Sequence, residues 1–350
     1  MKTDLLDLTK AELTELILSL GEAKFRAGQI YDWLHRGYDI HEMTNISKSL
    51  REKLAEVAFV TRPNILKRAR SAIDGTVKYL FEMPDGQRIE SVLMRYKHGN
   101  SICISTQAGC RMGCKFCAST LGGKVRDLSA GEILSQVLTV MRDVGERISN
   151  IVMMGIGEPL DNYENVIKFL RLVGSPDGVN IGYRHISLST CGVVPGIYAL
   201  AKEEFPITLS ISLHSTNDAE RSELMPVNRK WGIDELLSAC RSYFDTTGRR
   251  ISFEYTLISG KNDDLPHARD LAKLLKKYFE NLPCHVNLIP VNPVKERGFD
   301  HGNTKEIRAF CEKLNSLGIN ATVRRHLGGD IDASCGQLRN SQGNDEEKEE

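Results

Sequence analysis

The sequence predicts an α/β fold: a partial (β/α)6 barrel preceded by a small N-terminal helical accessory domain. In the larger part of the chain, apolar strand-like runs alternate with amphipathic helical runs about six times. This alternation is typical of parallel strands joined by crossover helices, and it falls short of the eight units of a full barrel. The expected divisions are a helical accessory domain at 1–60, a linker and β segment at 61–96, a barrel core at 97–340 and a disordered acidic tail at 341–350.

Breaks in the hydrophobic pattern give the order of the elements. Apolar residues at helical spacing predict N-terminal helices over Thr9–Ser19, Lys24–Leu34 and Ser47–Leu54. The helical part ends at Thr61-Arg62-Pro63, because the residue before a proline disfavours helix. Pro84-Asp85-Gly86 predicts a turn between two strands within 76–96.

The barrel elements follow from residue 101 onward. The expected strands are Ile102–Thr106, Asn150–Met154, His185–Ser189, Ile207–Leu213, Ile251–Ile258, Val286–Val291 and a final Ala321–Arg325. The expected helices begin near Ser129, Tyr163, Pro195, Ile233, Leu265 and Thr304. Ser129 and Glu132 have the spacing of a capping box, which supports a helix start there.

Composition narrows the class of protein. The 350 residues carry a formal net charge of +0, which neither suggests nor excludes nucleic-acid binding, because binding depends on local basic patches. Neither a membrane-length apolar run nor a signal-peptide pattern is evident, so a cytoplasmic protein without membrane contact is expected. Nine cysteines, an odd number, argue against a disulfide framework and favour metal, cluster or redox chemistry.

Three of the cysteines form the most specific local motif. Cys110, Cys114 and Cys117 have C-x3-C-x2-C spacing, and three thiolates this close can hold three irons of a [4Fe–4S] cluster. The fourth iron would then be open to a ligand, with Phe116 shielding the cluster. The alternative is a zinc site, but zinc usually needs a second pair of ligands at short spacing, and the sequence offers no such pair.

This motif, after the first strand of a repeated β/α chain, resembles the radical-SAM superfamily. The resemblance implies that the open iron binds the amino and carboxylate groups of S-adenosylmethionine (SAM), and that reduction yields a 5′-deoxyadenosyl radical. Small polar or glycine residues at strand ends match the superfamily's SAM-contacting positions, although each alone is also a common turn residue. The implied SAM contacts are Gly157, Glu158, Ser189, Ser212, Leu213, His214 and Asn292.

Two further cysteines narrow the resemblance. Cys335 lies in the glycine-rich segment Gly328–Leu338, which we expect to be deformable, and Cys103 lies on the first barrel strand. A buried apolar thiol is the simpler interpretation of an isolated cysteine. That interpretation is kept for the remaining cysteines, namely Cys191, Cys240, Cys284 and Cys311.

The segment Gly-x-Asp-Ile-x-Ala-x-Cys-Gly-Gln-Leu around Cys335 is similar to that of the dual-specificity 23S rRNA and tRNA adenine-C2 methyltransferases. The similarity covers nearly the whole chain except the tail, and a small departure is Ser334, where that family more often has alanine. The other matching segments are Phe25–Ile30, Glu42–Ser47, Gln107–Cys110, Met153–Leu160, Ser189–Pro195 and Leu288–Pro293.

The resemblance implies a two-stage reaction, since adenine C2 is a poor nucleophile. Cys335 would take a methyl group from one SAM, a second SAM would supply the radical, and the resulting methylene would join C2 and tether the RNA. Cys103 would release the tether by a transient disulfide with Cys335. Glu90 matches the position of the proton acceptor, although a strand glutamate facing solvent is the simpler interpretation.

The implied substrates are an adenosine in the peptidyl-transferase centre of 23S rRNA and the adenosine 3′ of the anticodon in some tRNAs. An electron donor such as flavodoxin or ferredoxin is implied as well, and a monomer is expected. Basic stretches at Lys67–Arg70 and Arg324–His326 are candidate phosphate contacts, and the accessory domain is the candidate RNA-binding part. Three alternatives stay open: an antibiotic-resistance methyltransferase acting on adenosine C8, a non-catalytic RNA-binding metalloprotein, and a radical-SAM enzyme for a small molecule.

Overall fold

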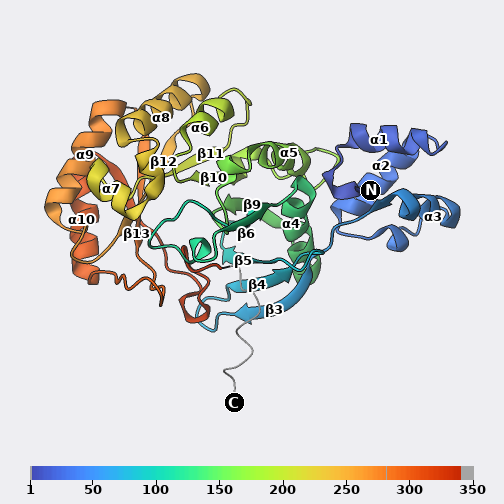
Figure 1. The fold of residues 1–350 in the computed structure, drawn as a ribbon, viewed down its shortest axis with the longest axis horizontal. Helices are drawn as coiled ribbons and strands as arrows, with labels where there is room; N and C mark the ends of the chain where they lie inside the picture. The colour runs from blue at the N-terminus through green and yellow to red at the C-terminus, as the bar shows by residue number, and fades with distance from the viewer. Residues whose placement is uncertain (1, 281, 340–350) are drawn as a thin grey trace, which may run out of the picture.

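A ten-stranded sheet lies at the centre of the protein (Figure 1). The protein is represented by a computed structural model that describes residues 2–280 and 282–339. The strand order is β14-β13-β12-β11-β10-β9-β6-β5-β4-β3. The parallel strands are β6 (Gly99–Cys103), β9 (Ile148–Met153), β10 (Ile186–Thr190), β11 (Thr208–Ser212), β12 (Ile251–Leu257), β13 (Cys284–Pro290) and β14 (Asn320–Val323). Apart from the final strand β14, these are the six strands of the predicted partial barrel, and the fold class is confirmed.

Helices connect the parallel strands and lie outside them (Figure 1). They are α4 (Ala130–Val144), α5 (Tyr163–Val173), α6 (Val194–Leu200), α8 (Ile233–Thr247), α9 (Leu265–Phe279) and α10 (Thr304–Ser316). The predicted capping box at the start of α4 is confirmed: Glu132 N donates to Ser129 Oγ at 3.2 Å, and Ser129 N donates to Glu132 Oε2 at 2.9 Å.

Three short elements within the barrel part of the chain were not predicted, and neither were the strands β1 (Thr3–Asp4), β2 (Ala58–Phe59) and β3 (Asn64–Arg70). A hairpin of β7 (Gln107–Gly109) and β8 (Lys124–Asp127) encloses the cysteine motif, and α7 (Asp218–Leu224) follows β11. Each is too short to show a hydrophobic period in the sequence. Short 3-10 helices complete the chain: η1 (Leu5–Asp7), η2 (Ile40–Glu42), η3 (Ala118–Thr120), η4 (Pro159–Asp161), η5 (Tyr183–His185), η6 (Pro226–Arg229) and η7 (Gly329–Ile331).

An antiparallel extension continues the sheet beyond β6. It consists of β5 (Arg88–Tyr96), β4 (Val77–Glu82) and β3 (Asn64–Arg70), with the predicted turn between β4 and β5. The basic stretch of residues 67–70 lies on β3, at the edge of the sheet. Arg68 Nε donates to Asp143 Oδ2 at 3.0 Å, so one of the positive side chains of this basic stretch is already paired with a carboxylate on α4.

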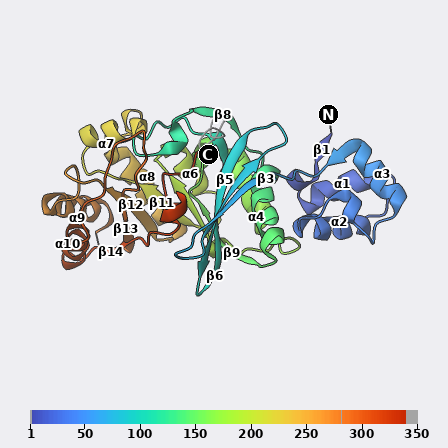
Figure 2. The same ribbon diagram turned by 90° about the horizontal axis from the view of Figure 1, so that it is seen from below.

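The N-terminal helices form a separate lobe at one end of the molecule, beside α4 (Figures 1 and 2). They are α1 (Lys10–Ser19), α2 (Phe25–His35) and α3 (Lys48–Val57). The lobe is not wholly helical, because β1 (Thr3–Asp4) pairs in parallel with β2 (Ala58–Phe59). Polar contacts attach it to the barrel: Gly131 N donates to Asp7 Oδ1 at 2.6 Å, and Lys168 Nζ lies 3.1 Å from Glu12 Oε1.

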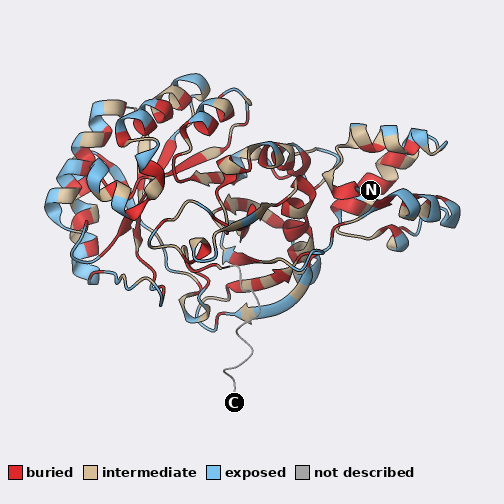
Figure 3. Ribbon diagram, viewed as in Figure 1, coloured by how far each residue is buried: buried red, intermediate tan, exposed pale blue. Residues whose placement is uncertain are grey.

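Both the N-terminal lobe and the barrel contain buried residues in their interiors and exposed residues on their outer helices (Figure 3). Every residue of β12 is buried, whereas three of the four residues of the edge strand β14 are exposed. Within residues 2–280 and 282–339, no helix is long and apolar enough to cross a membrane. The predicted acidic tail at 341–350 lies outside the described residues.

Candidate active site

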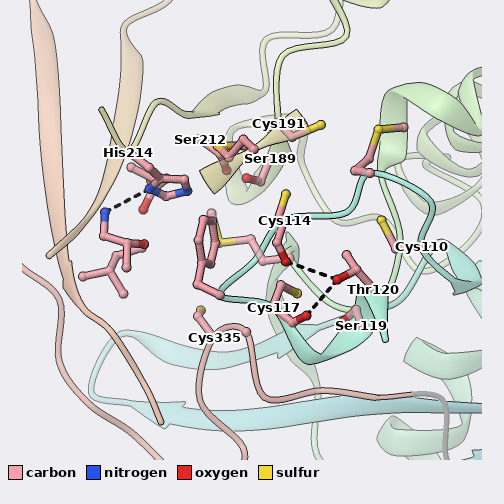
Figure 4. A pocket seen from close by; sticks show the side chains of 18 of the residues that line it. Cys110, Cys114, Cys117, Ser119, Thr120, Ser189, Cys191, Ser212, His214 and Cys335 are labelled. Carbon is pink, nitrogen blue, oxygen red and sulfur yellow. Dashed lines mark hydrogen bonds between the residues drawn. The ribbon is translucent and has the colours of Figure 1, made fainter. Parts of the chain in front are cut away.

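The cysteine motif lies over the carboxyl ends of the parallel strands, as the sequence predicts for a barrel enzyme. Cys110, Cys114 and Cys117 line one cavity together with residues from the ends of β9 to β13 (Figure 4). Their loop leaves the short hairpin at β7 and returns to it at β8. The hairpin therefore fixes both ends of the loop.

Hydrogen bonds hold the loop from within and from the chain segment that carries Cys335. Thr120 Oγ1 donates to the carbonyl oxygens of Cys114 at 3.1 Å and Cys117 at 3.0 Å (Figure 4). Ala118 N donates to Gly336 O at 2.7 Å, which links the motif to the segment that carries Cys335. The cysteine loop and the Cys335 segment are thus parts of one structure.

The thiols fit an iron–sulfur cluster better than a single metal ion. Burial raises the pKa of Cys110 to about 12 and raises the pKa of Cys114 and Cys117 too, so a metal would have to displace their protons. In the described part of the chain, no three His, Cys, Asp or Glu side chains converge as one ion requires. A [4Fe–4S] cluster instead uses each thiolate for a different iron, which suits three cysteines that line one cavity without meeting at one point.

Gly157 and Glu158 line the cavity at the end of β9. Gly157 has φ +111°, and a Cβ there would lie 2.7 Å from Gln107 Cβ, so only glycine fits this close approach. Glu158 is buried, which raises its pKa, and its Oε1 and Oε2 accept the N–H groups of Leu160 at 3.0 Å and Cys191 at 2.8 Å. The carboxylate is thereby held facing the cavity.

Ser189, Ser212 and His214 also line the cavity, from the ends of β10 and β11 (Figure 4). His214 Nδ1 accepts the Thr256 N–H at 2.9 Å, so the ring proton is on Nε2, and burial lowers the pKa of His214 to about 3. The neutral His214 ring can therefore donate a hydrogen bond through Nε2. Its backbone is left-handed, with φ +56°. Leu213, the remaining member of this predicted group, is fully buried in the core and does not line the cavity.

Several residues in and around the site were missed from the sequence, among them Cys191, Arg221 and the buried lining carboxylate Glu254. Cys191, assigned as a buried apolar thiol, does have that burial but also lines the cavity. Arg221 is fully buried on α7, where its guanidinium donates to the carbonyls of Leu213 at 2.9 Å, Cys191 at 2.8 Å and Ser212 at 2.9 Å. It holds the ends of β10 and β11, and no sequence pattern distinguishes such an arginine from a surface one.

Cys335 lines the same cavity and lies near Cys117 of the motif (Figure 4). Asn292 Nδ2 donates to Cys335 O at 2.9 Å, so this predicted SAM contact also fixes the Cys335 backbone. On the other side, Ser334 N donates to Gln337 Oε1 at 3.0 Å, and Ser334 Oγ donates to Leu327 O at 2.9 Å. The segment is more firmly anchored here than its glycines predict.

Cys103 ends β6 and is buried, without lining the cavity. The pKa of Cys103 is raised to about 12, mainly by burial and to a smaller extent by the negative charge of Cys335. All nine cysteines are free in this structure, so Cys103 and Cys335 do not form a disulfide here. Arg324 lies beside them, and the charges of Cys335 and then Glu254 raise its pKa. Within the basic stretch Arg324–His326, which was predicted to contact phosphate, Arg324 therefore points into the cavity and not toward solvent.

Glu90 does not face solvent, so that simpler interpretation is wrong. The side chain is buried on β5, with Oε1 3.3 Å from Lys78 Nζ and Oε2 accepting the Arg339 N–H at 2.8 Å. Burial raises its pKa. Glu90 lies outside the lining of the cavity and fixes the chain just after Cys335.

Comparisons with known proteins agree with this arrangement. Residues 3–60 match the ribosomal RNA large subunit methyltransferase N-terminal domain, and residues 104–275 match the radical SAM superfamily. A crystal structure of a radical SAM methyltransferase from Sphaerobacter thermophilus superposes with a TM-score of 0.92 and 44% identity, covering 97% of this chain and 100% of that one.

Curated relatives extend over nearly the full length. A probable dual-specificity RNA methyltransferase RlmN from Clostridium botulinum (strain Alaska E43) is 55% identical, with 97% of this chain and 96% of the relative covered. The protein of the same name from Desulforamulus reducens is 54% identical with the same coverage. The chain therefore belongs to the RlmN family of dual-specificity RNA methyltransferases, in the radical SAM superfamily, whose members imply a [4Fe–4S] cluster and SAM.

Proposed function

We propose that this protein converts adenosine to 2-methyladenosine in 23S rRNA, at the peptidyl-transferase centre, and in tRNA, 3′ of the anticodon. The observation that carries the proposal is the position of Cys335. Its side chain lines the cavity of the three motif cysteines and also a second cavity beside it. A methyl group accepted there from one side can be delivered on the other.

The motif residues Cys110, Cys114 and Cys117 would hold the cluster. When bound, the cluster supplies the electron that cleaves SAM and so generates the hydrogen-abstracting radical. Two SAM molecules are consumed per turnover in this proposal, because one donates the methyl group and the other provides the radical. The proposed SAM contacts are Gly157, Glu158, Ser189, Ser212, Leu213, His214 and Asn292, and Leu213 would act only through its backbone, since its side chain is in the core.

Cys335 acts first as a nucleophile. Its thiolate attacks the SAM methyl carbon, an S–C bond forms, and S-adenosylhomocysteine leaves with the electron pair of the broken bond. Asn292 holds the Cys335 backbone during this step. One hydrogen atom would pass from the S-methyl group to the 5′-deoxyadenosyl radical, and the resulting carbon radical would add to adenine C2 and tether the RNA to Cys335. The bound cluster would supply the acceptor for the unpaired electron of this adduct.

Cys103 and Glu90 complete the proposed cycle. Glu90 accepts the C2 proton, which requires that its Oε2 be released from the Arg339 N–H, since a base must reach its proton. The Cys103 thiolate then attacks the Cys335 sulfur and forms a disulfide. The S–C bond breaks with its electron pair passing to the carbon, which takes up a proton, so the methylated base is released. External thiol restores both cysteines. The closeness of Cys103 to Cys335 supports the pairing, and Cys103→Ser should leave RNA covalently bound to the protein on denaturing gels.

Several further assignments belong to the proposal. Residues 1–60 would be an RNA-binding accessory domain, 61–96 a linker with β structure, and 97–340 the radical-SAM core. The similarity of 3–60 to an rRNA methyltransferase domain supports the first of these. A flavodoxin or ferredoxin would deliver the electron, and the enzyme would work as a monomer in the cytoplasm.

The test is mass spectrometry of nucleosides from 23S rRNA and tRNA of cells lacking the endogenous enzyme. Cells are complemented with wild type, Cys335→Ala or the control Cys284→Ala, whose thiol lines neither cavity. We expect 2-methyladenosine with wild type and Cys284→Ala and none with Cys335→Ala. Detection of 8-methyladenosine instead would show the C8 regiochemistry, and absence of both with an intact cluster would refute RNA methylation.

The metal assignment has its own test. Protein purified without oxygen should be brown and carry about four irons per chain. Cys114→Ser should remove the charge-transfer absorbance, whereas Cys284→Ser should keep it. A colourless wild-type protein containing one zinc would contradict the cluster and favour the non-catalytic alternative.

A further inference from the structure

A second cavity, of about 350 Å³, lies next to the one that contains the motif cysteines. The two cavities share four lining residues: Ile289, Asn292, Arg324 and Cys335. Cys335 is therefore part of a common wall that can be reached from both sides. The volume falls within the range of about 300–1,000 Å³ of small-ligand pockets.

The second cavity offers an aromatic face beside apolar side chains. Tyr96, at the end of β5, lines it, and the ring of His98 stacks on Tyr96 with a centroid distance of 5.1 Å and an interplanar angle of 16°. Met94 and Leu327 add apolar surface. A flat ring next to apolar atoms is the arrangement that stacks on a nucleobase.

The charge of this cavity is one-sided. Its lining includes Arg324, Arg325 and His326 but no carboxylate. Arg325 and His326 are exposed, and Arg325 forms no ion pair with any carboxylate in the described part of the chain. Most other arginines near the site are paired, so Arg325 is available to an external anion such as an RNA phosphate.

The same charges argue against SAM as the occupant. SAM carries a sulfonium and an ammonium group, and the second cavity would bring both near arginine without a carboxylate to compensate. The first cavity does contain carboxylates, those of Glu158 and Glu254. The two cavities are therefore suited to ligands of different charge.

We propose that the second cavity receives the target adenosine, with its base stacked on Tyr96 and its flanking phosphate at Arg325 and His326. This assignment rests on the proposed function and names the part of the site that holds its RNA substrate. The base would be turned out of its stack to reach Cys335. SAM and RNA would then approach Cys335 from different sides, so neither must leave before the other binds.

The experiment measures the dissociation constant for an unmodified tRNA transcript. We expect Tyr96→Ala and Arg325→Ala each to weaken binding about tenfold. Tyr96→Phe, which keeps the ring, should bind like wild type, as should the matched controls Tyr198→Ala and Arg269→Ala on exposed helix positions. Arg325→Ala should also lower the slope of log Kd against log salt by about one.

Two readouts separate this assignment from a folding defect and from the proposed function. SAM binding to Tyr96→Ala at wild-type affinity would show that the first cavity is intact. Photolabelling of the full-length protein with 8-azidoadenosine 5′-monophosphate should modify Tyr96 or the segment 323–327. If wild type makes 2-methyladenosine but the label lies elsewhere and both alanine variants bind tRNA within twofold of wild type, the assignment is wrong. If the label falls here and no methyladenosine forms, the nucleotide site stands and the proposed function fails.

Discussion

Arg221 offers the sharpest test of how the site is built. Its guanidinium is fully buried and donates to three backbone carbonyls, as well as to Asn228 Oδ1 at 2.8 Å. Replacing it with methionine keeps most of the volume but removes this donor from three buried acceptors; the fourth, Leu213 O, still accepts another backbone N–H at 2.8 Å. Each unsatisfied acceptor costs roughly 1–3 kcal/mol, partly relieved by relaxation. We therefore expect Arg221→Met to lower the free energy of unfolding by about 4 kcal/mol.

The same substitution should reach the cofactor site. Two of the freed carbonyls, those of Cys191 and Ser212, belong to the strand ends that line the first cavity. A loss of about 1.4 kcal/mol in positioning these ends raises the Kd for SAM about tenfold. Urea denaturation and SAM titration of the purified protein measure the two effects separately.

The control is Arg269→Met on the exposed face of α9, which should change the free energy of unfolding by less than about 0.5 kcal/mol. If Arg221→Met is as stable as this control and binds SAM like wild type, the buried network has no such role. If stability falls but SAM affinity does not, Arg221 supports the fold without positioning the strand ends.

Three other perturbations have defined outcomes. Burial lowers the pKa of His35 from 6.5 to about 4. The folded protein should therefore lose about 3 kcal/mol of stability as the pH falls from 6.5 to 4, because the unfolded chain binds the proton more readily. Urea unfolding of His35→Gln should lack this loss, and the same pH dependence in both proteins would contradict it. Ser129→Ala should lower the free energy of unfolding by about 1 kcal/mol through loss of the α4 cap, and a change below about 0.3 kcal/mol would be inconsistent with that contribution. Gly157→Ala should weaken SAM binding at least about tenfold, because the new Cβ meets Gln107 and φ is positive. The control Gly122→Ala meets no atom within 4 Å and should bind SAM like wild type. Equal affinities of the two variants for SAM would refute the close approach at Gly157.

Much of the fold could be predicted from the sequence, because the parallel strands and their helices are long enough to show a period. The start of α4 was predicted from its helical run and its capping-box spacing, and Ser129 and Glu132 make both expected bonds. The β1–β2 pair could not be predicted, since two residues show no alternation and their partners lie more than fifty residues away along the chain.

The site was predictable where spacing or resemblance carries chemistry. The cysteine motif and the strand-end residues around Ser189 and His214 do meet in one cavity. Burial was the weak point, because it depends on contacts between distant segments. Glu90 was expected to face solvent from its strand, yet it is covered by the chain at Arg339, and Leu213 packs into the core next to residues that line the cavity.

The edge of the sheet at β3 has a consequence for the protein in solution. An edge strand exposes unpaired backbone groups that can join the edge of another molecule and start aggregation. On β3 the exposed side chains include Lys67, Arg68 and Arg70, and the register with β4 shifts between Ile65 and Lys67. Like charges repel a second copy of the same edge, and an irregular strand is a poor template for pairing. The cations on this strand thus protect an open sheet from self-association, whether or not they ever contact a phosphate.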